Sequence, residues 1–138
     1  MNWEYKTKQN EERIGALRVS IIHNSGNTEI LNNMGYHSPD GFQIGYAGSG
    51  PADLAYSILT DYMIRSNNID LVDIPGRVEI YHQLFKNDFI VEAKESLSID
   101  SNTIKLWLDV QDNIDDKKSG YQYWMERLDS VGRKQDND

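Results

Sequence analysis

Hydrophobic and polar residues alternate along residues 13–22, where Leu17, Val19 and Ile21 occupy every second position. This period of two is typical of a β-strand with one buried face. The sequence HNSGNT follows and predicts a turn, because Asn and Gly tolerate positive φ values. Residues 28–34 would then form the returning strand of a hairpin.

The period changes at residue 51, where hydrophobic residues begin to recur at helical spacing. We expect an amphipathic helix from residue 51 to about residue 65, with one stripe facing the core. Pro51 suits the first helical position, because an N–H would have no partner there. Asp53, in the first turn, would complement the positive end of the helix dipole.

Three more helices are predicted downstream. Hydrophobic residues at steps of three and four predict a helix over residues 78–93, with Pro75 and Gly76 marking its start. The stretch SIDSNTIKLWLD predicts a short helix with Ser101 as its cap. Residues 121–131 repeat the helical spacing.

These elements predict an α+β fold in a single domain that spans residues 1–138. A small antiparallel sheet from the N-terminal third, including a short strand at residues 42–46, would carry the helices. A C-terminal helical segment would close over an edge or a partner. One domain also suits the length, because 138 residues bury one core. Residues 1–10 and 133–138 are candidate flexible ends.

Composition excludes several classes of function. The formal net charge of −8 disfavours duplex DNA and membranes as partners, because both attract positively charged proteins. The chain has no Cys, and no stretch approaches the roughly 20 apolar residues that span a bilayer. The three His residues stand apart without metal-ligand spacing, so we predict neither a metal nor a cofactor. A cytoplasmic protein is the simplest interpretation.

The sequence GYAGSGPADLA, residues 45–55, places small residues immediately before the predicted helix. The backbone N–H groups of Gly48, Ser49 and Gly50, with the Ser49 hydroxyl, would form an anion cradle at the positive helix end. The alternative is that the glycines only permit a tight turn. This sequence matches neither the Walker motif, nor GxGxxG, nor GxSxG.

The stretches HSPDGFQIGYAGSGPADLAYSILTDY and YHQLFKNDFIVEA, residues 37–62 and 81–93, carry a resemblance. They resemble an uncharacterised family, a domain of unknown function found in bacteria, archaea and phages, whose signature is close to HSPDGFxWGYxGSGPAxLAxxLL. The resemblance covers most of residues 13–110. Ile44 departs from it, because the family usually has Trp there.

Within this family, the small acidic chain is similar to the first class of phage Thoeris anti-defence proteins, which are nucleotide sponges. That resemblance implies binding of glycocyclic ADP-ribose, the signal that TIR enzymes make from NAD, in the host cytoplasm and without cleavage. It also implies a homo-oligomer built from dimers, and some members hold cyclic oligonucleotides. An enzyme is therefore not expected.

Such a ligand needs hydrogen-bond donors for its phosphates and an aromatic surface on which its base can stack. Arginine suits phosphate because its planar fork donates two hydrogen bonds, and an aromatic ring can stack on adenine. We therefore predict a ligand site from Gly48, Ser49, Gly50, Arg18, Arg77, Arg127, Phe42, Tyr46 and Phe85, with Tyr36 a further aromatic candidate. Contacts with ribose or base edges would come from His37, Gln43, Asn87 and Asp88.

Two other functions stay open. A nucleotide-processing hydrolase would use Ser49 with His37 and an Asp, although nothing in the sequence fixes that geometry. A protein-interaction module with no nucleotide ligand would use aromatic residues near the acidic C-terminal loop, namely Trp107, Tyr121, Tyr123 and Trp124.

Overall fold

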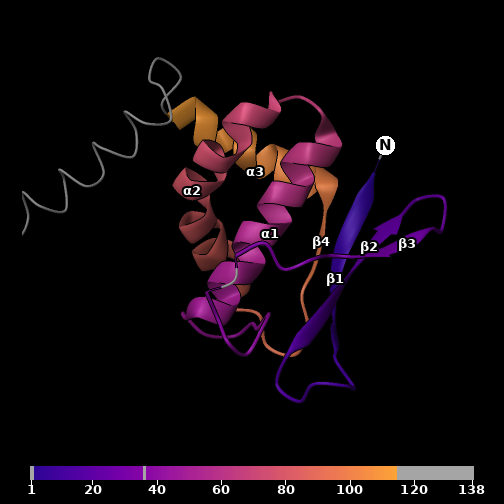
Figure 1. Ribbon diagram of the computed structural model, residues 1–138. Coiled ribbons are helices and arrows are strands. Elements are labelled where there is room, and N and C mark those ends of the chain that lie inside the picture. Colours follow the sequence, from indigo (N-terminus) through magenta and orange to yellow (C-terminus); the bar gives the residue numbers. More distant parts are fainter. Residues whose placement is uncertain (1, 36, 115–138) are drawn as a thin grey trace, which may run out of the picture.

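The computed structural model describes residues 2–35 and 37–114. It has an antiparallel sheet on one side and helices packed against it on the other (Figure 1). This is the predicted α+β architecture, with helices on a sheet to which the N-terminal third contributes three strands. The predicted helix at residues 121–131 lies outside the described residues.

The sheet has four strands in the order β3-β2-β1-β4. They are β1 (Trp3–Gln9), β2 (Leu17–His23), β3 (Thr28–Ile30) and β4 (Ser98–Asp100). Strand β1 is central, and it pairs with β2 over seven residues and with β4 on its other side. Most of the N-terminal segment that we expected to be flexible is therefore a strand of the sheet.

Two predicted strands differ from those observed. The returning strand of the hairpin ends at Ile30 and does not reach residue 34. Residues 42–46 form no strand, and only Phe42 makes an isolated bridge, to Leu17. The reason is Gly45, whose φ of +89° interrupts an extended chain. Strand β4, from much later in the chain, completes the sheet.

The helical elements are α1 (Ser49–Ser66), the short 3₁₀ turn η1 (Leu71–Asp73), α2 (Ile74–Phe85), its π-helical extension η2 (Lys86–Ile90), and α3 (Ser101–Ile114). The predicted helix over residues 51–65 is confirmed, but it begins two residues earlier, so Pro51 is its third residue. Pro75 lies in the first turn of α2, where its missing N–H removes no helix bond.

Helix α1 lies at the centre of the core. Its side chains Leu54, Ile58 and Leu59 are completely buried between the sheet and α2. Burying each such side chain stabilises the fold by about 1.5–3 kcal/mol. Helix α3 is held through Trp107, whose Nε1 donates to Asp88 Oδ2 at 2.8 Å.

A buried polar chain joins the sheet to α1. Tyr5 of β1 accepts a hydrogen bond from Trp3 Nε1 at 2.9 Å and donates one to Asp61 Oδ2 at 2.6 Å. Burial first, and then the nearby Asp61 carboxylate, raise the pKa of Tyr5, so its hydroxyl stays protonated. Arg65 Nε donates to the same Asp61 oxygen at 2.7 Å.

The Arg65 guanidinium extends this chain to the hairpin. It donates to both carboxylate oxygens of Glu29, at 2.7 and 3.1 Å. Hydrogen bonds from Arg65 and from His23 lower the pKa of Glu29 to about 2. The buried carboxylate of α1 and the exposed carboxylate of β3 thus share one cation.

Removing the buried hydroxyl should destabilise the fold. In the variant Tyr5→Phe, the Asp61 carboxylate and the Trp3 indole N–H each lose a partner, so we expect a loss of about 1–3 kcal/mol in the free energy of unfolding. Urea denaturation measures it. Tyr46→Phe removes a hydroxyl from a half-exposed side chain and should cost less than about 0.5 kcal/mol. Equal losses in the two variants would contradict the role of the buried chain.

The start of α3 is capped by Asp100 and not by Ser101. Asp100 Oδ1 accepts a hydrogen bond from the Thr103 backbone N–H at 2.7 Å. The predicted cap, Ser101, is buried, and its hydroxyl accepts from the Trp3 backbone N–H at 3.1 Å. The hydrogen bond from the Thr103 backbone lowers the pKa of Asp100.

Replacing this cap should destabilise α3 in a pH-dependent way. We expect Asp100→Ala to cost about 1 kcal/mol, while Asp100→Ser, which keeps a capping oxygen, costs much less. A lowered folded pKa means that the ionised cap stabilises the fold above the unfolded pKa, and that this contribution is lost as the pH falls through the folded pKa. The difference between wild type and Asp100→Ala in chemical denaturation should therefore shrink below about pH 4. A constant difference down to pH 2 would contradict this assignment.

Candidate functional site: a cleft between two helices

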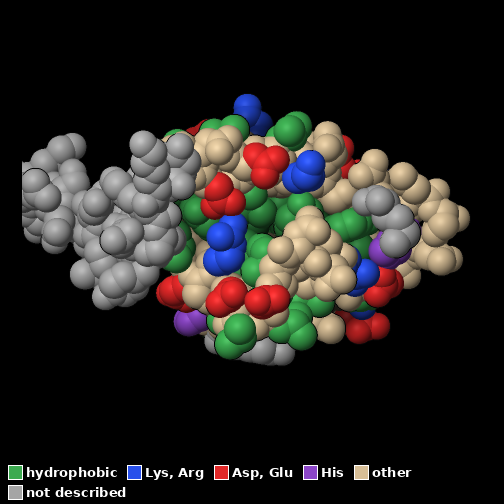
Figure 2. Space-filling view, turned by 90° about the horizontal axis from the view of Figure 1, so that it is seen from above, with side chains coloured by type: hydrophobic (Ala, Val, Ile, Leu, Met, Phe, Trp, Pro, Cys, Tyr) green, Lys and Arg blue, Asp and Glu red, His purple; other side chains and the backbone are tan. Residues whose placement is uncertain are grey.

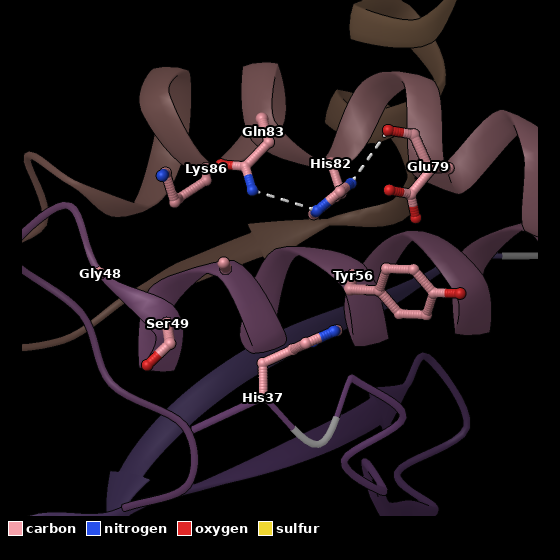
Figure 3. A pocket seen from close by; sticks show the side chains of 9 residues that line it. His37, Gly48, Ser49, Tyr56, Glu79, His82, Gln83 and Lys86 are labelled. Carbon is pink, nitrogen blue, oxygen red and sulfur yellow. Dashed lines mark hydrogen bonds between the residues drawn. The ribbon is translucent and has the colours of Figure 1, made fainter. Parts of the chain in front are cut away.

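A cleft of about 480 Å³ lies between the start of α1 and the outer face of α2 (Figure 3). Its volume falls in the range of small-molecule sites, about 300–1,000 Å³. The walls come from α1, from α2 with η2, and from the loop before α1. The lining residues are His37, Gly48, Ser49, Ala52, Tyr56, Glu79, His82, Gln83 and Lys86.

The α2 wall is a polar stripe, and its members are Glu79, His82, Gln83 and Lys86. Their spacing of three, one and three residues places them on one face of a helix with 3.6 residues per turn. The opposite face is apolar and buried in the core, and it contains Val78, Tyr81 and Phe85.

His82 is oriented by its own helix. Its Nδ1 lies 3.0 Å from the Val78 carbonyl oxygen and 3.2 Å from that of Glu79. Because a carbonyl only accepts, Nδ1 carries the proton and Nε2 is left as an acceptor, 3.2 Å from Gln83 Nε2. The His82 ring also meets the ring of Tyr56 edge to face, with the centroids 5.4 Å apart.

The α1 wall begins with unsatisfied backbone donors. Gly48 is the N-cap residue and provides no side-chain cap. In the described part of the chain, no acceptor is bonded to the N–H groups of Ser49 and Gly50, and the first helical bond runs from Ala52 N to Gly48 O. The positive end of an 18-residue helix therefore opens onto the cleft.

The glycines beside Ser49 also have a structural reason. A Cβ on Gly48 would overlap the ring of Tyr46, and one on Gly50 would lie 2.5 Å from Gln43 Oε1 and 2.8 Å from Gln43 Cβ. The Tyr46 hydroxyl donates to that same Gln43 oxygen. Both glycines therefore make room for side chains of the preceding loop, and Ser49 between them is exposed.

A buried carboxylate positions the loop on which His37 lies. Asp53 is 0% exposed, and it accepts hydrogen bonds from the backbone N–H groups of His37 and Ser38 at 2.9 and 2.8 Å. It also lies 3.1 Å from His37 Nδ1, so that nitrogen donates and Nε2 is free. Asp53 therefore organises this loop and is not the first-turn dipole partner that we expected.

Only part of the predicted site is brought together. Gly48 and Ser49 line the cleft, Gly50 and Tyr46 lie next to them, and His37 joins them from the preceding loop. Phe42 and Phe85 are core residues, with 6% and 0% exposure, so neither offers a stacking face. Arg127 and Tyr36 lie outside the described residues.

The two described arginines of the prediction lie elsewhere. Arg18 is exposed beside the turn between β1 and β2. Arg77 donates to Asp112 of α3 at 2.9 Å and lies over the ring of Tyr81. It lines a separate hollow together with Asp70 and Asp73. Figure 2 shows acidic and basic side chains interspersed on the face of the molecule seen from above. The structure therefore places Arg18 and Arg77 outside the cleft that Ser49 lines.

Six lining residues were missing from the predicted site: Ala52, Tyr56, Glu79, His82, Gln83 and Lys86. The signal that could have found four of them is the polar stripe, because polar residues at helical spacing mark one face of α2. The sequence alone does not say that this face borders the start of α1. Gln43, Asn87 and Asp88 line no part of the cleft.

Two kinds of feature are absent from the described residues. Within residues 2–35 and 37–114, no cluster of three His, Asp or Glu side chains could hold a metal ion. No described helix combines the length and the apolar character needed to cross a membrane.

The fold and the cleft define a small α+β domain with a polar site between two helices. The chain belongs to a family of unknown function, DUF6166, whose model matches residues 11–110. The match includes both walls of the cleft and the whole of the GYAGSGPADLA stretch. No curated protein and no solved structure matches the chain.

The loop geometry predicts opposite outcomes for one substitution at two glycines. A Cβ on Gly35 would overlap the Asp53 carboxylate and lie 3.0 Å from its Cα, whereas one on Gly76 would meet nothing within 4 Å. We expect Gly35→Ala to destabilise the fold by about 1–3 kcal/mol. Gly76→Ala should stabilise it by up to about 1 kcal/mol, because Ala favours the helix. Thermal denaturation of both variants tests this, and a neutral Gly35→Ala would contradict the close packing around Asp53.

Proposed function

We propose that the chain binds a nucleotide in the cleft between α1 and α2 and holds it without cleavage. The observation that carries this proposal is the convergence of cationic and N–H donors. Lys86 stands across the cleft from Ser49 and the unpaired N–H groups at the start of α1 (Figure 3). A phosphate group is the ligand that matches such a donor set.

The phosphate would bind at the end of the cleft formed by Ser49 and Lys86. Backbone N–H groups at a helix start donate in one direction, and the Ser49 hydroxyl, which points away from α2 in Figure 3, would add a further donor after rotating about its Cα–Cβ bond. Lys86 supplies a full positive charge, and no described carboxylate pairs with it. This local cation lets an acidic protein bind an anion.

The nucleoside would occupy the rest of the cleft. The ring of Tyr56 is partly exposed there and offers a face for a base. His82 and Gln83 lie between Tyr56 and Lys86, where they could bond to ribose hydroxyls. These residues replace Phe42 and Phe85 of the sequence-based site.

Sequestration is favoured over hydrolysis by the arrangement around Ser49. In Figure 3 its hydroxyl points away from His37, so the pair lacks the contact that activates a nucleophile. The paired His37 and Asp53 nevertheless resemble two of the three members of a catalytic triad. Nucleotide hydrolysis, with His37 Nε2 as a general base, is therefore the second candidate.

The biological ligand that we propose is glycocyclic ADP-ribose, the signal of TIR enzymes, which would make the protein a phage anti-defence sponge of the host cytoplasm. This choice of ligand is supported by the sequence resemblance, together with a cleft that offers hydrogen-bond donors to a phosphate and an aromatic ring to a base. Cyclic oligonucleotides are a second ligand class, and a homo-oligomer built from dimers is the expected assembly.

Native mass spectrometry with glycocyclic ADP-ribose tests the proposal and reports the oligomer in the same spectrum. After heat release, chromatography should recover unchanged ligand at a fixed ratio per chain. Recovery of a cleaved product would instead establish the hydrolase. If no nucleotide mass binds, nucleotide binding is wrong and a protein partner becomes the function to seek.

The assignment of the phosphate site predicts that Lys86 contributes to ligand affinity and that Arg18 does not. Lys86→Gln should weaken binding of glycocyclic ADP-ribose by about tenfold or more, because a charge-assisted hydrogen bond is worth about 1.5–3 kcal/mol. Arg18→Gln removes the same charge from an exposed strand position outside the cleft and should leave affinity within about twofold. Isothermal titration calorimetry measures both variants, and equal losses would show that only net charge matters.

A further inference from the structure

The cleft carries opposite charges at its two ends. Lys86 faces Ser49 at one end, and Glu79 faces Tyr56 at the other (Figure 3). On each wall the two residues are seven positions apart, which is two helical turns or about 10 Å. That span is comparable with an extended mononucleotide from its phosphate to the far edge of its base.

The groups at both ends are free to bind a ligand. In the described part of the chain, no hydrogen bond or ion pair engages the side-chain polar atoms of Ser49, Tyr56, Glu79 or Lys86. The middle of the cleft is different, because His82 is held by its own helix and by Gln83. The charged side chains of the cleft that have no partner in the described part of the chain therefore lie at its two ends.

These charges permit one orientation of a nucleotide. A phosphate beside Glu79 would meet a like charge, whereas beside Lys86 it gains an opposite one. With the phosphate at Lys86, the base reaches the ring of Tyr56, and its outer edge reaches the Glu79 carboxylate. A carboxylate only accepts hydrogen bonds, so this edge must present a donor.

We propose that Glu79 is a specificity-determining residue that selects bases with an exocyclic amino group. Adenine, cytosine and guanine carry such a donor, and a carboxylate is its natural acceptor. A base without the amino group leaves the exposed Glu79 carboxylate to water and lacks this hydrogen bond, which weakens binding. This inference rests on the proposed function, because it assumes that the cleft holds a nucleotide.

The test compares AMP with purine riboside 5′-monophosphate, which differs only by lacking the amino group. We expect the wild-type protein to bind AMP about tenfold more tightly in calorimetry. Glu79→Ala should bind both nucleotides equally, because the partner of the amino group is gone. Glu12→Ala, at an exposed position outside the cleft, should keep the wild-type preference.

The outcomes separate this inference from the proposed function. Equal wild-type affinities, or an AMP preference that survives in Glu79→Ala, would overturn the selection by Glu79. Binding of glycocyclic ADP-ribose without binding of AMP would also overturn it, because the cleft would then not hold a mononucleotide in this orientation. If wild-type protein binds none of the three nucleotides, the proposed function itself fails.

Discussion

Two buried carboxylates on α1 constrain both the fold and the cleft. Asp53 and Asp61 are eight residues apart on a helix whose apolar side chains are completely buried, and each would cost several kcal/mol if left without partners. Asp61 is satisfied by Tyr5 of the sheet and by Arg65, which fixes α1 against the strands. Asp53 is satisfied by backbone N–H groups of the preceding loop, which fixes that loop beside the start of α1. The same helix therefore holds the core and shapes the cleft.

Hydrophobic periodicity predicted helix α1 and strand β2 well, but it missed strands β1 and β4. Helix α1 has enough buried apolar residues for its helical period to be evident in the sequence, and so does helix α2. Strand β1 was missed because charged residues separate Trp3, Tyr5 and Thr7, so few apolar positions mark the alternation. Strand β4 is three residues long and is recognisable only from its pairing with β1. Long-range pairing of this kind leaves no local pattern in the sequence.

The residues of the candidate site also divide into those that the sequence predicts and those that it does not. The position of Ser49 at a helix start could be predicted, because Gly and Pro around it are local signals. The partners across the cleft could not, because they depend on how α2 rotates against α1. That rotation follows from the burial of Val78, Tyr81 and Phe85, which turns the polar stripe outward. Arg77 is on another face and pairs with Asp112, so its guanidinium serves the contact between α2 and α3.

The construction of the cleft bears on what it is suited to do. Its walls are helices held by the core, and its loop is held by Asp53, so binding a ligand there orders few additional groups. Such preorganisation reduces the entropic cost of association and favours tight retention. Catalytic turnover would require a further arrangement, in which the Ser49 hydroxyl turns toward His37. Tyr46 and Gln43 pack against the glycines on either side of Ser49, and this packing holds the backbone of the loop in place. The proposal that the cleft retains a nucleotide therefore rests on walls held by the core, with donors at one end and a carboxylate at the other.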